Sequence, residues 1–570
     1  MKYIKIYNEW MNSPYFDEET KTELLAIRDD QKEIEDRFYK NLEFGTAGMR
    51  GIIGAGTNRI NKYTVRRATF GLGNCIINKK GEEGRKRGVV IAHDCRHRSK
   101  EFSIEAAKTL ASLGIKSFLF DDLRTTPELS FAVRNLGAIA GIVITASHNP
   151  PEYNGYKVYW EDGAQVTSDI AQEIIGEIEK INDYSVIPTI DEDLARNKEL
   201  INLLGEDQDT AFIEVVKKQS LRPDIIEKVS DEFKIVFTPF HGTGNKPVRR
   251  VLKEVGFKNV LVVKEQENPD PNFSTVAYPN PEEKEAFNLS IELAKKENAH
   301  IIIGTDPDCD RVGAVVKNKD GEYVVLTGNQ TGALLLEYIL SNKKDKGSLP
   351  DNSVIIKTIV TSKFGQVVAQ NYGVEVLNTL TGFKYIGEKI KEFEQTKEKT
   401  FIFGYEESYG YLCGTHARDK DAVVASMLIA EMAAYYYTRG MSLYEGLLEL
   451  YEKYGYYKEG LKSLTLKGKE GSEKIKEMIK HFKQNPIENI GKYKVKQMKD
   501  YSKGIDNLPK SDVIIYEMED ESWCAIRPSG TEPKIKFYFS VNGKSSTDVD
   551  EKLENLVEGL MNKVNDFMKN

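Results

Sequence analysis

The stretch HIIIGTDPDCDR, residues 300–311, indicates the fold class, because a short β-branched apolar run breaks directly into a polar loop. GIVITASHNP at 141–150 and FIFGYEESYG at 401–410 have the same form. Each apolar run is too short for a buried helix and is typical of a buried strand. Helical patterns such as 103–114 and 286–299 flank these runs. The alternation predicts α/β domains with largely parallel sheets.

The organisation of the chain follows from its length and from changes in composition. At about 100–200 residues per domain, 570 residues predict three to five domains. A polar stretch at 181–193 and a charged run at 205–230 indicate the end of the first domain. In parallel sheets ligands gather beyond the carboxyl ends of the strands, so we expect the three polar loops to line one cleft. The chain ends in a predicted helix whose apolar positions are Val549, Leu553, Leu556, Leu560, Val564 and Phe567.

Composition excludes several classes of function. Hydrophobic residues make up 40% and charged residues 29%, which is ordinary for a globular protein. A net charge of −8 argues against nucleic-acid binding. Five scattered cysteines, none in a C-x-x-C pair, indicate thiols in a reducing compartment. The N-terminus has no signal-peptide core and no apolar run reaches ~18–20 residues, so we expect a cytoplasmic location without membrane insertion.

The DPDCDR loop predicts a metal site. Asp306, Asp308 and Asp310 alternate along an extended turn, which places three carboxylates close enough to bind one hard cation. Without a cation these carboxylates would repel one another. Magnesium is the natural candidate. An EF-hand is excluded, because Arg311 and Lys317 occupy the positions where it requires glycine and glutamate.

The TASHNP loop, residues 145–150, places Ser147 where it can project into a cleft. An ordinary turn whose hydroxyls cap the local backbone would explain the same letters. We disfavour a serine hydrolase, because neighbours on an extended strand point to opposite faces and His148 could not easily take a proton from Ser147. No G-x-S-x-G elbow is present either.

The C-terminal loop RPSGTEPKIK, residues 527–536, is typical of a phosphate cradle. It combines cations, hydroxyls and open backbone N–H groups, supplied by Arg527, Ser529, Gly530, Thr531 and Lys536. A surface turn is the alternative. No P-loop motif is present, which disfavours nucleotide hydrolysis.

Two further loops give weaker signals. In GYEESYG, Glu406 and Ser408 could hydrogen-bond vicinal sugar hydroxyls. In THARDKD, His416, Arg418 and Lys420 form a local basic cluster that could contact a phosphate or move a proton. A solvated loop explains this second segment equally well.

With these loops in order, the chain strongly resembles the α-D-phosphohexomutases, the family that includes phosphoglucomutases and phosphomannomutases. The resemblance extends from FGTAGMRG (44–51) and VVIAHDCRHRS (89–99) to the C-terminal loop. It implies three similar α/β domains with mixed, largely parallel sheets, plus a smaller α+β C-terminal domain, around a central cleft. The four domains would span residues 1–205, 206–325, 326–455 and 456–570.

The resemblance also implies roles for individual residues. Ser147 would be the phosphoserine, and the other catalytic groups would be His148, Lys420, Arg311 and Arg50. The substrate-binding groups would be Thr381, Gly382, Glu406, Ser408, Arg527, Ser529, Gly530 and Thr531. One Mg²⁺ per chain would be bound by Ser147, Asp306, Asp308 and Asp310. Lys536 stands where many relatives carry arginine, so its contact would be single-pronged.

The activity implied by the resemblance is the interconversion of α-D-glucose 1-phosphate and glucose 6-phosphate. Phospho-Ser147 would donate its phosphoryl group, the bisphosphate would turn end for end, and the serine would take back the other phosphate. Glucose 1,6-bisphosphate would prime the enzyme, which would act as a monomer or homodimer. Mannose or pentose phosphates remain alternative substrates. A sugar bisphosphate synthase remains an alternative activity.

Two other classes of protein match parts of the sequence. A phosphoaspartate phosphatase of the haloacid dehalogenase type shares a strand followed by D-x-D. Against it, Asp310 replaces the expected Thr or Val, Gly304 and Thr305 intrude between strand and aspartate, and Ser147 has no role. A catalytically silent sugar-phosphate sensor is disfavoured by the intact serine and aspartates.

Overall fold

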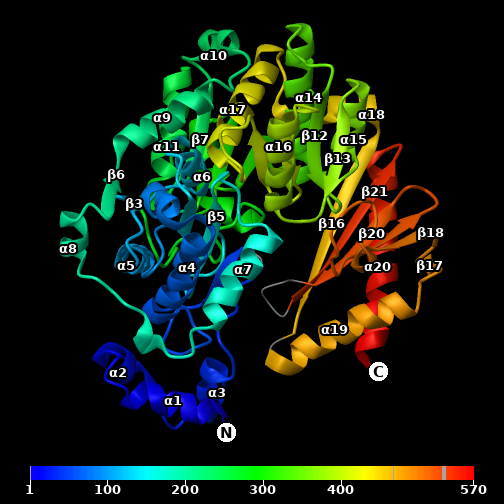
Figure 1. Cartoon of the computed structure of the whole chain (residues 1–570). Helices are drawn as coiled ribbons and strands as arrows, with labels where there is room; N and C mark the ends of the chain where they lie inside the picture. Colours follow the sequence, from blue (N-terminus) through cyan, green and yellow to red (C-terminus); the bar gives the residue numbers. More distant parts are fainter. Residues whose placement is uncertain (1, 46, 467, 529–533, 570) are drawn as a thin grey trace. The chain divides into compact units, whose positions relative to one another are not determined.

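The computed structural model describes residues 2–45, 47–466, 468–528 and 534–569 (Figure 1). The chain divides into two compact units. The larger unit holds residues up to 328 together with 383–443, and the smaller unit holds 329–382 together with the residues from 444 onward.

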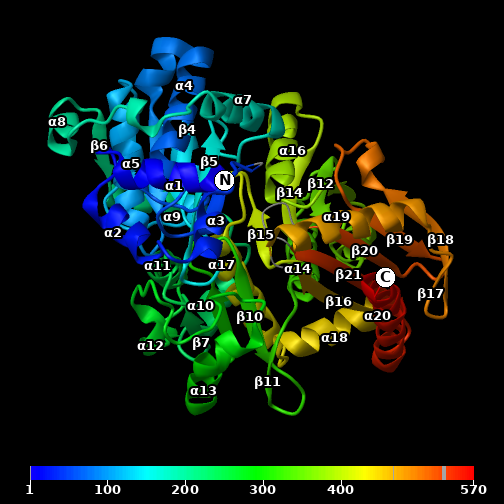
Figure 2. The ribbon, with the colours of Figure 1, turned by 90° about the horizontal axis from the view of Figure 1, so that it is seen from below.

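The larger unit begins with three helices (Figure 2), and aromatic side chains form the core between them. These helices are α1 (Lys2–Asn12), α2 (Glu18–Ala26) and α3 (Gln31–Phe38). Trp10 stacks on Phe16 with ring centroids 4.1 Å apart. The cluster forms because the aromatic positions recur at helical spacing and face one another across the three helices.

The first sheet has the strand order β1-β5-β4-β2-β3-β6. Its strands are β1 (Gly48–Ile52), β2 (Val89–His93), β3 (Ser117–Phe120), β4 (Ala140–Ile144), β5 (Tyr153–Trp160) and β6 (Ile201–Leu204). Strands β2, β3, β4 and β6 are parallel, whereas β5 runs antiparallel to β4 and to β1. The sheet is therefore mixed, as predicted.

Helices cover both faces of this sheet, because successive side chains of a strand point to opposite faces. Val89 and Ile91 pack with residues of helices α4, α5 and α7, while Val90 and Ala92 pack with residues of α6. The helices of this region are α4 (Lys62–Arg87), α5 (Ser99–Ser112), α6 (Thr126–Asn135), α7 (Ser168–Glu179), η1 (Tyr184–Val186) and α8 (Glu192–Asn197).

The second sheet repeats this arrangement with the order β11-β10-β9-β7-β8. Its strands are β7 (Lys234–Thr238), β8 (Asn259–Val262), β9 (Ile301–Thr305), β10 (Val312–Lys317) and β11 (Tyr323–Val325). Strand β9 includes Gly304 and Thr305, so the expectation that these two residues separate the strand from Asp306 is wrong. The helices are α9 (Glu206–Lys217), α10 (Pro223–Val229), α11 (Asn245–Val255), α12 (Lys264–Glu267), η2 (Lys284–Phe287) and α13 (Asn288–Glu297).

The third α/β region contributes to both units. In the larger unit, β14 (Thr400–Glu406) and β15 (Gly410–Cys413) form an antiparallel hairpin beside α16 (Phe383–Thr396) and α17 (Ala422–Thr438). In the smaller unit, β12 (Ser353–Thr358) and β13 (Glu375–Thr379) are parallel. The remaining helices here are α14 (Gly328–Asp345), α15 (Phe364–Asn371) and α18 (Leu443–Tyr454).

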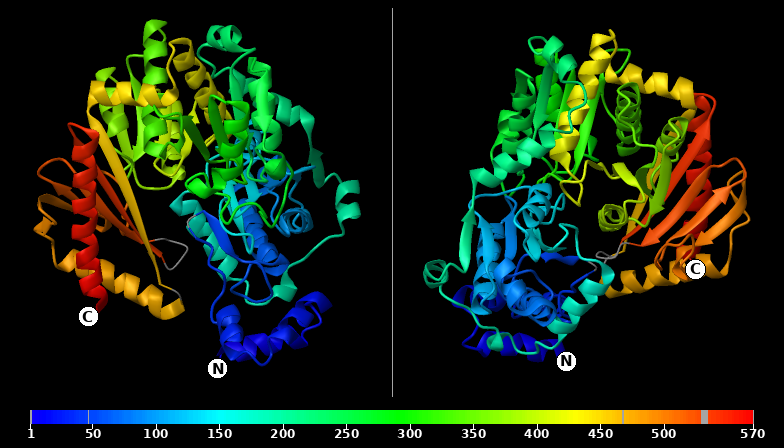
Figure 3. Two further views of the ribbon diagram at one scale, coloured as in Figure 1. Left: turned by 180° about the vertical axis from the view of Figure 1, so that it is seen from behind. Right: turned by 45° about the horizontal axis from the view of Figure 1, so that its top comes forward.

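The smaller unit closes with an antiparallel sheet of order β16-β21-β20-β19-β18-β17. Its elements are β16 (Tyr456–Thr465), α19 (Gly468–Gln484), β17 (Asn489–Ile490), β18 (Tyr493–Asp500), η3 (Tyr501–Lys503), β19 (Ile514–Met518), β20 (Trp523–Pro528), β21 (Lys534–Gly543) and α20 (Ser546–Lys569). Helix α20 lies along this sheet (Figure 3), and the predicted apolar positions pack into its core. This confirms the final helix.

The predicted fold class is confirmed: three α/β regions precede a smaller, β-rich C-terminal region. The three strands that open the polar loops lie where the sequence places them, as β4, β9 and β14. None of the helices in the described ranges has the length and apolar content of a transmembrane span. No disulfide joins any of the five cysteines.

Candidate functional site

Three loops in the larger unit share one local design. In each, a buried strand ends, a short polar loop follows, and the chain returns as an antiparallel neighbour: β4 to β5, β9 to β10, and β14 to β15. The polar side chains therefore stand at the carboxyl end of the first strand of each pair.

A buried arginine, Arg96, hydrogen-bonds the backbone of the loop around Ser147. Arg96 donates hydrogen bonds to the carbonyls of Ser147, at 2.6 Å, Asn149 and Pro150, at 2.7 Å. Its partner Asp94 accepts a hydrogen bond of 2.6 Å from Thr145 Oγ1, which in turn accepts one of 2.8 Å from the Ser147 N–H. This network fixes the backbone in an unusual conformation, since Ser147 has φ 52°.

Two functional groups lie within hydrogen-bond distance of the Ser147 hydroxyl. Ser147 Oγ donates to Asp306 Oδ2 at 2.7 Å and lies 3.2 Å from His148 Nδ1. The expectation that Ser147 and His148 point apart is therefore wrong. It assumed an extended strand, but β4 ends at Ile144 and the positive φ of Ser147 turns the two side chains toward each other.

The three aspartates converge as predicted. Asp306, Asp308 and Asp310 are all buried, and one carboxylate oxygen from each lies within 4.8 Å of the others. Asp306 Oδ1 accepts hydrogen bonds from the backbone N–H groups of Asp310 and Arg311, at 3.1 and 2.9 Å. Thr126 Oγ1 donates to Asp308 Oδ2 at 2.8 Å.

Two carboxylate oxygens in this cluster have unmet bonding capacity. Asp308 Oδ1 and Asp310 Oδ1 are buried and accept no hydrogen bond from any residue that the structure describes. Buried carboxylate oxygens are costly unless paired or bound to a metal. Oxygen ligands in this number suit a hard divalent cation, so the residues fit a metal ion.

The local charges shift the proton affinities of the cluster. Burial and the neighbouring Asp308 and Asp310 charges raise the pKa of Asp306 well above its ordinary value. Burial acts in the same direction on Asp308, but the Lys157 ammonium outweighs it and holds the pKa of Asp308 well below its usual range. The two carboxyls therefore differ in proton affinity, and a bound cation would favour the ionised form of both.

Two lysines face the acidic cluster. Lys157 Nζ lies 2.7 Å from Asp308 Oδ2, and Lys420 Nζ lies 2.9 Å from Asp310 Oδ2. Burial lowers the pKa of Lys420, but the Asp310, Asp419 and Glu406 carboxylates raise it above its ordinary value. Burial likewise lowers the pKa of Lys157, but the Asp308 and Asp310 carboxylates raise it above its ordinary value, so both lysines remain charged.

Lys157, Asp419 and Arg96 are site residues that the sequence reasoning missed. Asp419 positions Lys420, because it accepts hydrogen bonds from Tyr159 OH at 2.7 Å and from the Lys420 backbone N–H at 2.8 Å. A signal for Lys157 was present, because it is the one charged residue in the largely buried strand β5. Such a charge within a buried strand indicates a partner or a function.

The other predicted catalytic residues lie near these loops. Arg311 NH1 donates to Glu282 Oε1 at 2.6 Å, and Arg311 Nε lies 3.9 Å from Asp310 Oδ1. Arg50, on β1, donates to Asn149 Oδ1 at 3.1 Å in the serine loop. Glu406 ends strand β14 and is buried, and Ser408 follows in the turn before β15.

The basic cluster of THARDKD is only partly what the sequence suggested. His416 Nε2 is bonded to Asp421 Oδ2 at 2.7 Å, and the buried Arg418 pairs with Glu394. Of the three, only Lys420 contacts the acidic cluster. The prediction of one common basic cluster is therefore wrong, because carboxylates already bind His416 and Arg418.

The remaining predicted residues belong to the smaller unit. Thr381 and Gly382 lie between β13 and α16, and Gly382 has φ 114°. Arg527 pairs across the sheet with Lys536, so both cations occupy one face of the β20–β21 hairpin. Ser529, Gly530 and Thr531 lie outside the described residues.

Comparison with known proteins identifies the class to which this fold and site belong. The family models for Phosphoglucomutase/phosphomannomutase alpha/beta/alpha domains I, II and III match residues 41–185, 210–321 and 327–454. The chain therefore belongs to the phosphoglucomutase/phosphomannomutase family, the α-D-phosphohexomutases, and the predicted enzyme class, a mutase, is confirmed. Family membership also removes the phosphatase alternative.

Individual relatives agree with this assignment. Proteins named phosphoglucomutase from Staphylococcus haemolyticus and Staphylococcus aureus strain MRSA252 are 37% and 38% identical, over 92% of this chain and 95% of each relative. The fold matches the open form of pp63/parafusin, a phosphoglucomutase from Paramecium, with a TM-score of 0.70 at 18% identity, covering 93% and 96% of the two chains. It also matches a phosphoglucomutase/phosphomannomutase family protein from Burkholderia thailandensis, with a TM-score of 0.65 at 20% identity, covering 91% and 96%.

Proposed function

We propose that this chain is a phosphoglucomutase, which interconverts α-D-glucose 1-phosphate and glucose 6-phosphate through phospho-Ser147 and glucose 1,6-bisphosphate. The observation that carries this proposal is the 2.7 Å contact between Ser147 Oγ and Asp306 of the acidic cluster. A hydroxyl beside three convergent carboxylates is suited to metal-assisted phosphoryl transfer. The names of the staphylococcal relatives support glucose as the sugar.

The proposed metal is one Mg²⁺ ion, held by Asp306, Asp308 and Asp310 together with an oxygen on Ser147. The two carboxylate oxygens without hydrogen-bond donors among the described residues, Asp308 Oδ1 and Asp310 Oδ1, support this assignment. When bound, the ion would supply positive charge to the phosphate oxygens.

The chain's own residues would do the remaining work at the serine. The P–O bond to Ser147 breaks as a sugar hydroxyl forms its own bond to phosphorus, and the proton of that hydroxyl ends on Ser147 Oγ. The roles reverse when the serine is phosphorylated again. His148 Nδ1, at 3.2 Å, is placed to take the proton from Ser147 Oγ in that return step. Arg311 and Lys420 lie beside the cluster, where their charges would stabilise the phosphate that moves.

The substrate-binding roles rest on chemistry and family resemblance. Glu406 and Ser408 would hydrogen-bond the sugar hydroxyls, and Thr381 and Gly382 would contact the sugar. Arg527, with Ser529, Gly530 and Thr531, would hold the phosphate that does not react. The cross-strand pairing of Arg527 with Lys536 supports a cationic site there.

We further propose the domain division at 1–205, 206–325, 326–455 and 456–570. It is supported by the family models, which match 41–185, 210–321 and 327–454. Small sugar phosphates would be the partners, with glucose 1,6-bisphosphate as the primer and the cytoplasm as the location.

Transfer of label to the protein tests the phosphoserine. Incubation with glucose 1,6-bisphosphate carrying ³²P and Mg²⁺ should label the chain at Ser147, as located by peptide mass spectrometry. Ser147→Ala should accept no label and retain its circular dichroism spectrum. Ser168→Ala, at an exposed helix start, is the matched control and should be labelled normally. Label on an aspartate instead of Ser147 would refute the proposal.

A further inference from the structure

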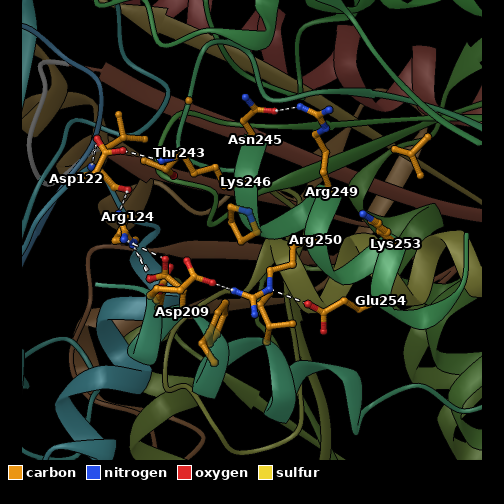
Figure 4. A pocket seen from close by; sticks show the side chains of 18 of the residues that line it. Asp122, Arg124, Asp209, Thr243, Asn245, Lys246, Arg249, Arg250, Lys253 and Glu254 are labelled. Carbon is orange, nitrogen blue, oxygen red and sulfur yellow. Dashed lines mark hydrogen bonds and ion pairs between the residues drawn. The ribbon is translucent and has the colours of Figure 1, made fainter. Parts of the chain in front are cut away.

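A cavity lies in the larger unit among residues outside the proposed Ser147 site (Figure 4). It has a volume of about 1120 Å³ and is bounded by the loop after β3, helix α9 and helix α11. Ligand pockets commonly span about 300–1,000 Å³, so this cavity can hold a small molecule. Within the described ranges, none of the proposed catalytic or substrate-binding residues lines it.

Helix α11 presents a basic stripe to this cavity. Lys246, Arg249, Arg250 and Lys253 all line it, and their spacing of three and four residues places them on one helix face. The opposite face of α11 is apolar and buried. Figure 4 shows Arg249, Arg250 and Lys253 on one side of the cavity and Arg124 with Asp209 on the other.

The carboxylates around the cavity leave part of this positive charge available. Lys246 pairs with Asp122 at 2.7 Å, but the two side chains are 74% and 51% exposed. Arg250 pairs with Glu206, which is 75% exposed. Exposed pairs of this kind contribute little to stability, so an anionic ligand can replace the carboxylates. Arg249 pairs with the less exposed Glu267 at 2.6 Å, so its charge is already engaged. Lys253 has no ion pair or side-chain hydrogen bond within the described part of the chain.

The other cavity-lining carboxylates are already engaged or buried. Arg124 holds Asp209 with two hydrogen bonds, of 2.7 and 3.0 Å. Glu254 accepts one from Arg250 at 2.7 Å. Glu128 is buried, and burial raises its pKa well above the ordinary value. These carboxyls therefore oppose an incoming anion less than their number suggests.

The walls of the cavity are fastened to one another through the acidic loop. Thr126, next to the β3 loop, donates from its backbone N–H to the Asp308 carbonyl at 2.9 Å. On the α11 side, Thr243 donates from its N–H to the Pro307 carbonyl at 2.8 Å. The two walls are thus hydrogen-bonded to adjacent residues, Pro307 and Asp308, so the cavity is pre-formed. Binding of a ligand then costs little free energy for ordering the walls. Its apolar floor, which includes Phe212 and Phe257, strengthens electrostatic attraction.

We propose that this cavity is a binding site for a small molecule carrying two or more phosphate groups. Lys246 and Lys253 would contact its phosphate oxygens, because ammonium groups form charge-assisted hydrogen bonds with phosphate. The site is separate from the proposed catalysis, and the proposal does not depend on the sugar that the enzyme uses.

Calorimetry with inorganic pyrophosphate tests this proposal. In metal-free buffer of low ionic strength, the wild-type chain should bind pyrophosphate. Lys246→Gln/Lys253→Gln should bind it at least about tenfold more weakly, because two charge-assisted contacts are lost. Lys253→Gln alone should show an intermediate loss, which guards against misfolding of the double variant. The control Lys295→Gln/Lys296→Gln, which removes the same charge from exposed positions on α13, should bind like wild type.

Hydrogen exchange locates the bound anion. Pyrophosphate should slow amide exchange in peptides that cover residues 121–128 and 245–255 of the wild-type chain. Equal binding by wild type and Lys246→Gln/Lys253→Gln would overturn the proposal. So would the absence of binding, or protection confined to other parts of the chain such as residues 527–536.

Discussion

At the scale of single residues, the site depends on groups that offset the cost of one another's burial. Asp308 carries charge in the interior because Lys157 and Thr126 donate to it, at 2.7 and 2.8 Å. Its second oxygen has no such donor among the described residues. This half-satisfied state is what a metal ligand requires, since the cation completes the bonding that the protein leaves open.

Asp308→Asn should weaken binding of Mn²⁺, used as a probe for Mg²⁺, at least about 100-fold, because a ligand charge is lost from a three-carboxylate site. Titration calorimetry measures the affinity directly, without reference to turnover. Asp320→Asn, in the exposed turn between β10 and β11, serves as the control and should bind like wild type. Equal Mn²⁺ affinity in the two variants would contradict the metal assignment.

Glu459, on β16, makes the stability of the smaller unit depend on pH. Burial raises its pKa from an ordinary value of 4.5 to about 7. Between these two values the folded chain holds a proton that the unfolded chain has lost, so stability falls as pH rises through this window and levels off above it. The shift corresponds to at most about 3 kcal/mol.

Glu459→Gln should therefore raise the melting temperature at pH 8 relative to wild type and have little effect at pH 4.5. Calorimetric scans at both values measure the difference. Glu558→Gln, exposed on α20, provides the comparison and should show no such pH-dependent gain. If the melting temperatures of wild type and Glu459→Gln differ by the same amount at both pH values, Glu459 is not held as a neutral acid in the folded chain.

At the scale of elements, the strand, polar loop and antiparallel return strand recur three times, and each repeat places chemistry at one end of a sheet. Close backbone packing holds these loops. A Cβ atom on Gly242 would lie 2.4 Å from Pro307 Cα, so the loop before α11 and the acidic loop touch at a position where only glycine fits.

Gly242→Ala should displace the acidic loop and lower both Mn²⁺ affinity and stability, the latter by about 1–3 kcal/mol, as for overpacked sites. Gly176→Ala is the matched control. A Cβ there meets no atom within 4 Å, and the residue lies inside helix α7, so stability should rise by about 0.5–1 kcal/mol. Chemical denaturation and titration calorimetry measure both effects. Unchanged metal affinity in Gly242→Ala would show that the loop does not depend on this contact.

The elements also show what the sequence could predict. The three strands were predictable because each combines β-branched residues with an abrupt polar loop, which is a local signal. The convergence of Asp306, Asp308 and Asp310 was also predictable from a local signal, because the three residues alternate within one short turn. The contact of Ser147 with Asp306 joins residues 159 positions apart. Sheet topology predicted that their loops share one cleft, but only the family resemblance placed Ser147 beside the metal ligands.

Other parts of the site depend on tertiary contacts that leave little trace in the sequence. The positive φ of Ser147 is imposed by Arg96 and Thr145, and no glycine marks the position, so the placement of His148 was predicted wrongly. The pairing of His416 with Asp421, and of Arg418 with Glu394, likewise removed two cations from a predicted cluster. The sequence of a loop does not reveal which carboxylates its basic residues will pair with in the folded chain.

At the scale of the whole molecule, an acidic chain of net charge −8 still places several cations beside the residues proposed to meet phosphate. In the larger unit the acidic loop is flanked by Lys157, Lys420 and Arg311. In the smaller unit two further cations, Arg527 and Lys536, lie opposite each other on adjacent strands. A mutase that passes through a bisphosphate needs both kinds of site, because one phosphate reacts while the other is held.

The most direct test of the proposed activity is an assay of the purified chain with Mg²⁺, a glucose 1,6-bisphosphate primer, and glucose 1-phosphate, mannose 1-phosphate or ribose 1-phosphate. Formation of each 6-phosphate or 5-phosphate product is followed separately. We predict that glucose 1-phosphate is converted fastest, by at least about tenfold in kcat/KM, and only when metal and primer are present. A faster rate with mannose or ribose 1-phosphate, or no conversion of any of the three, would contradict the proposal.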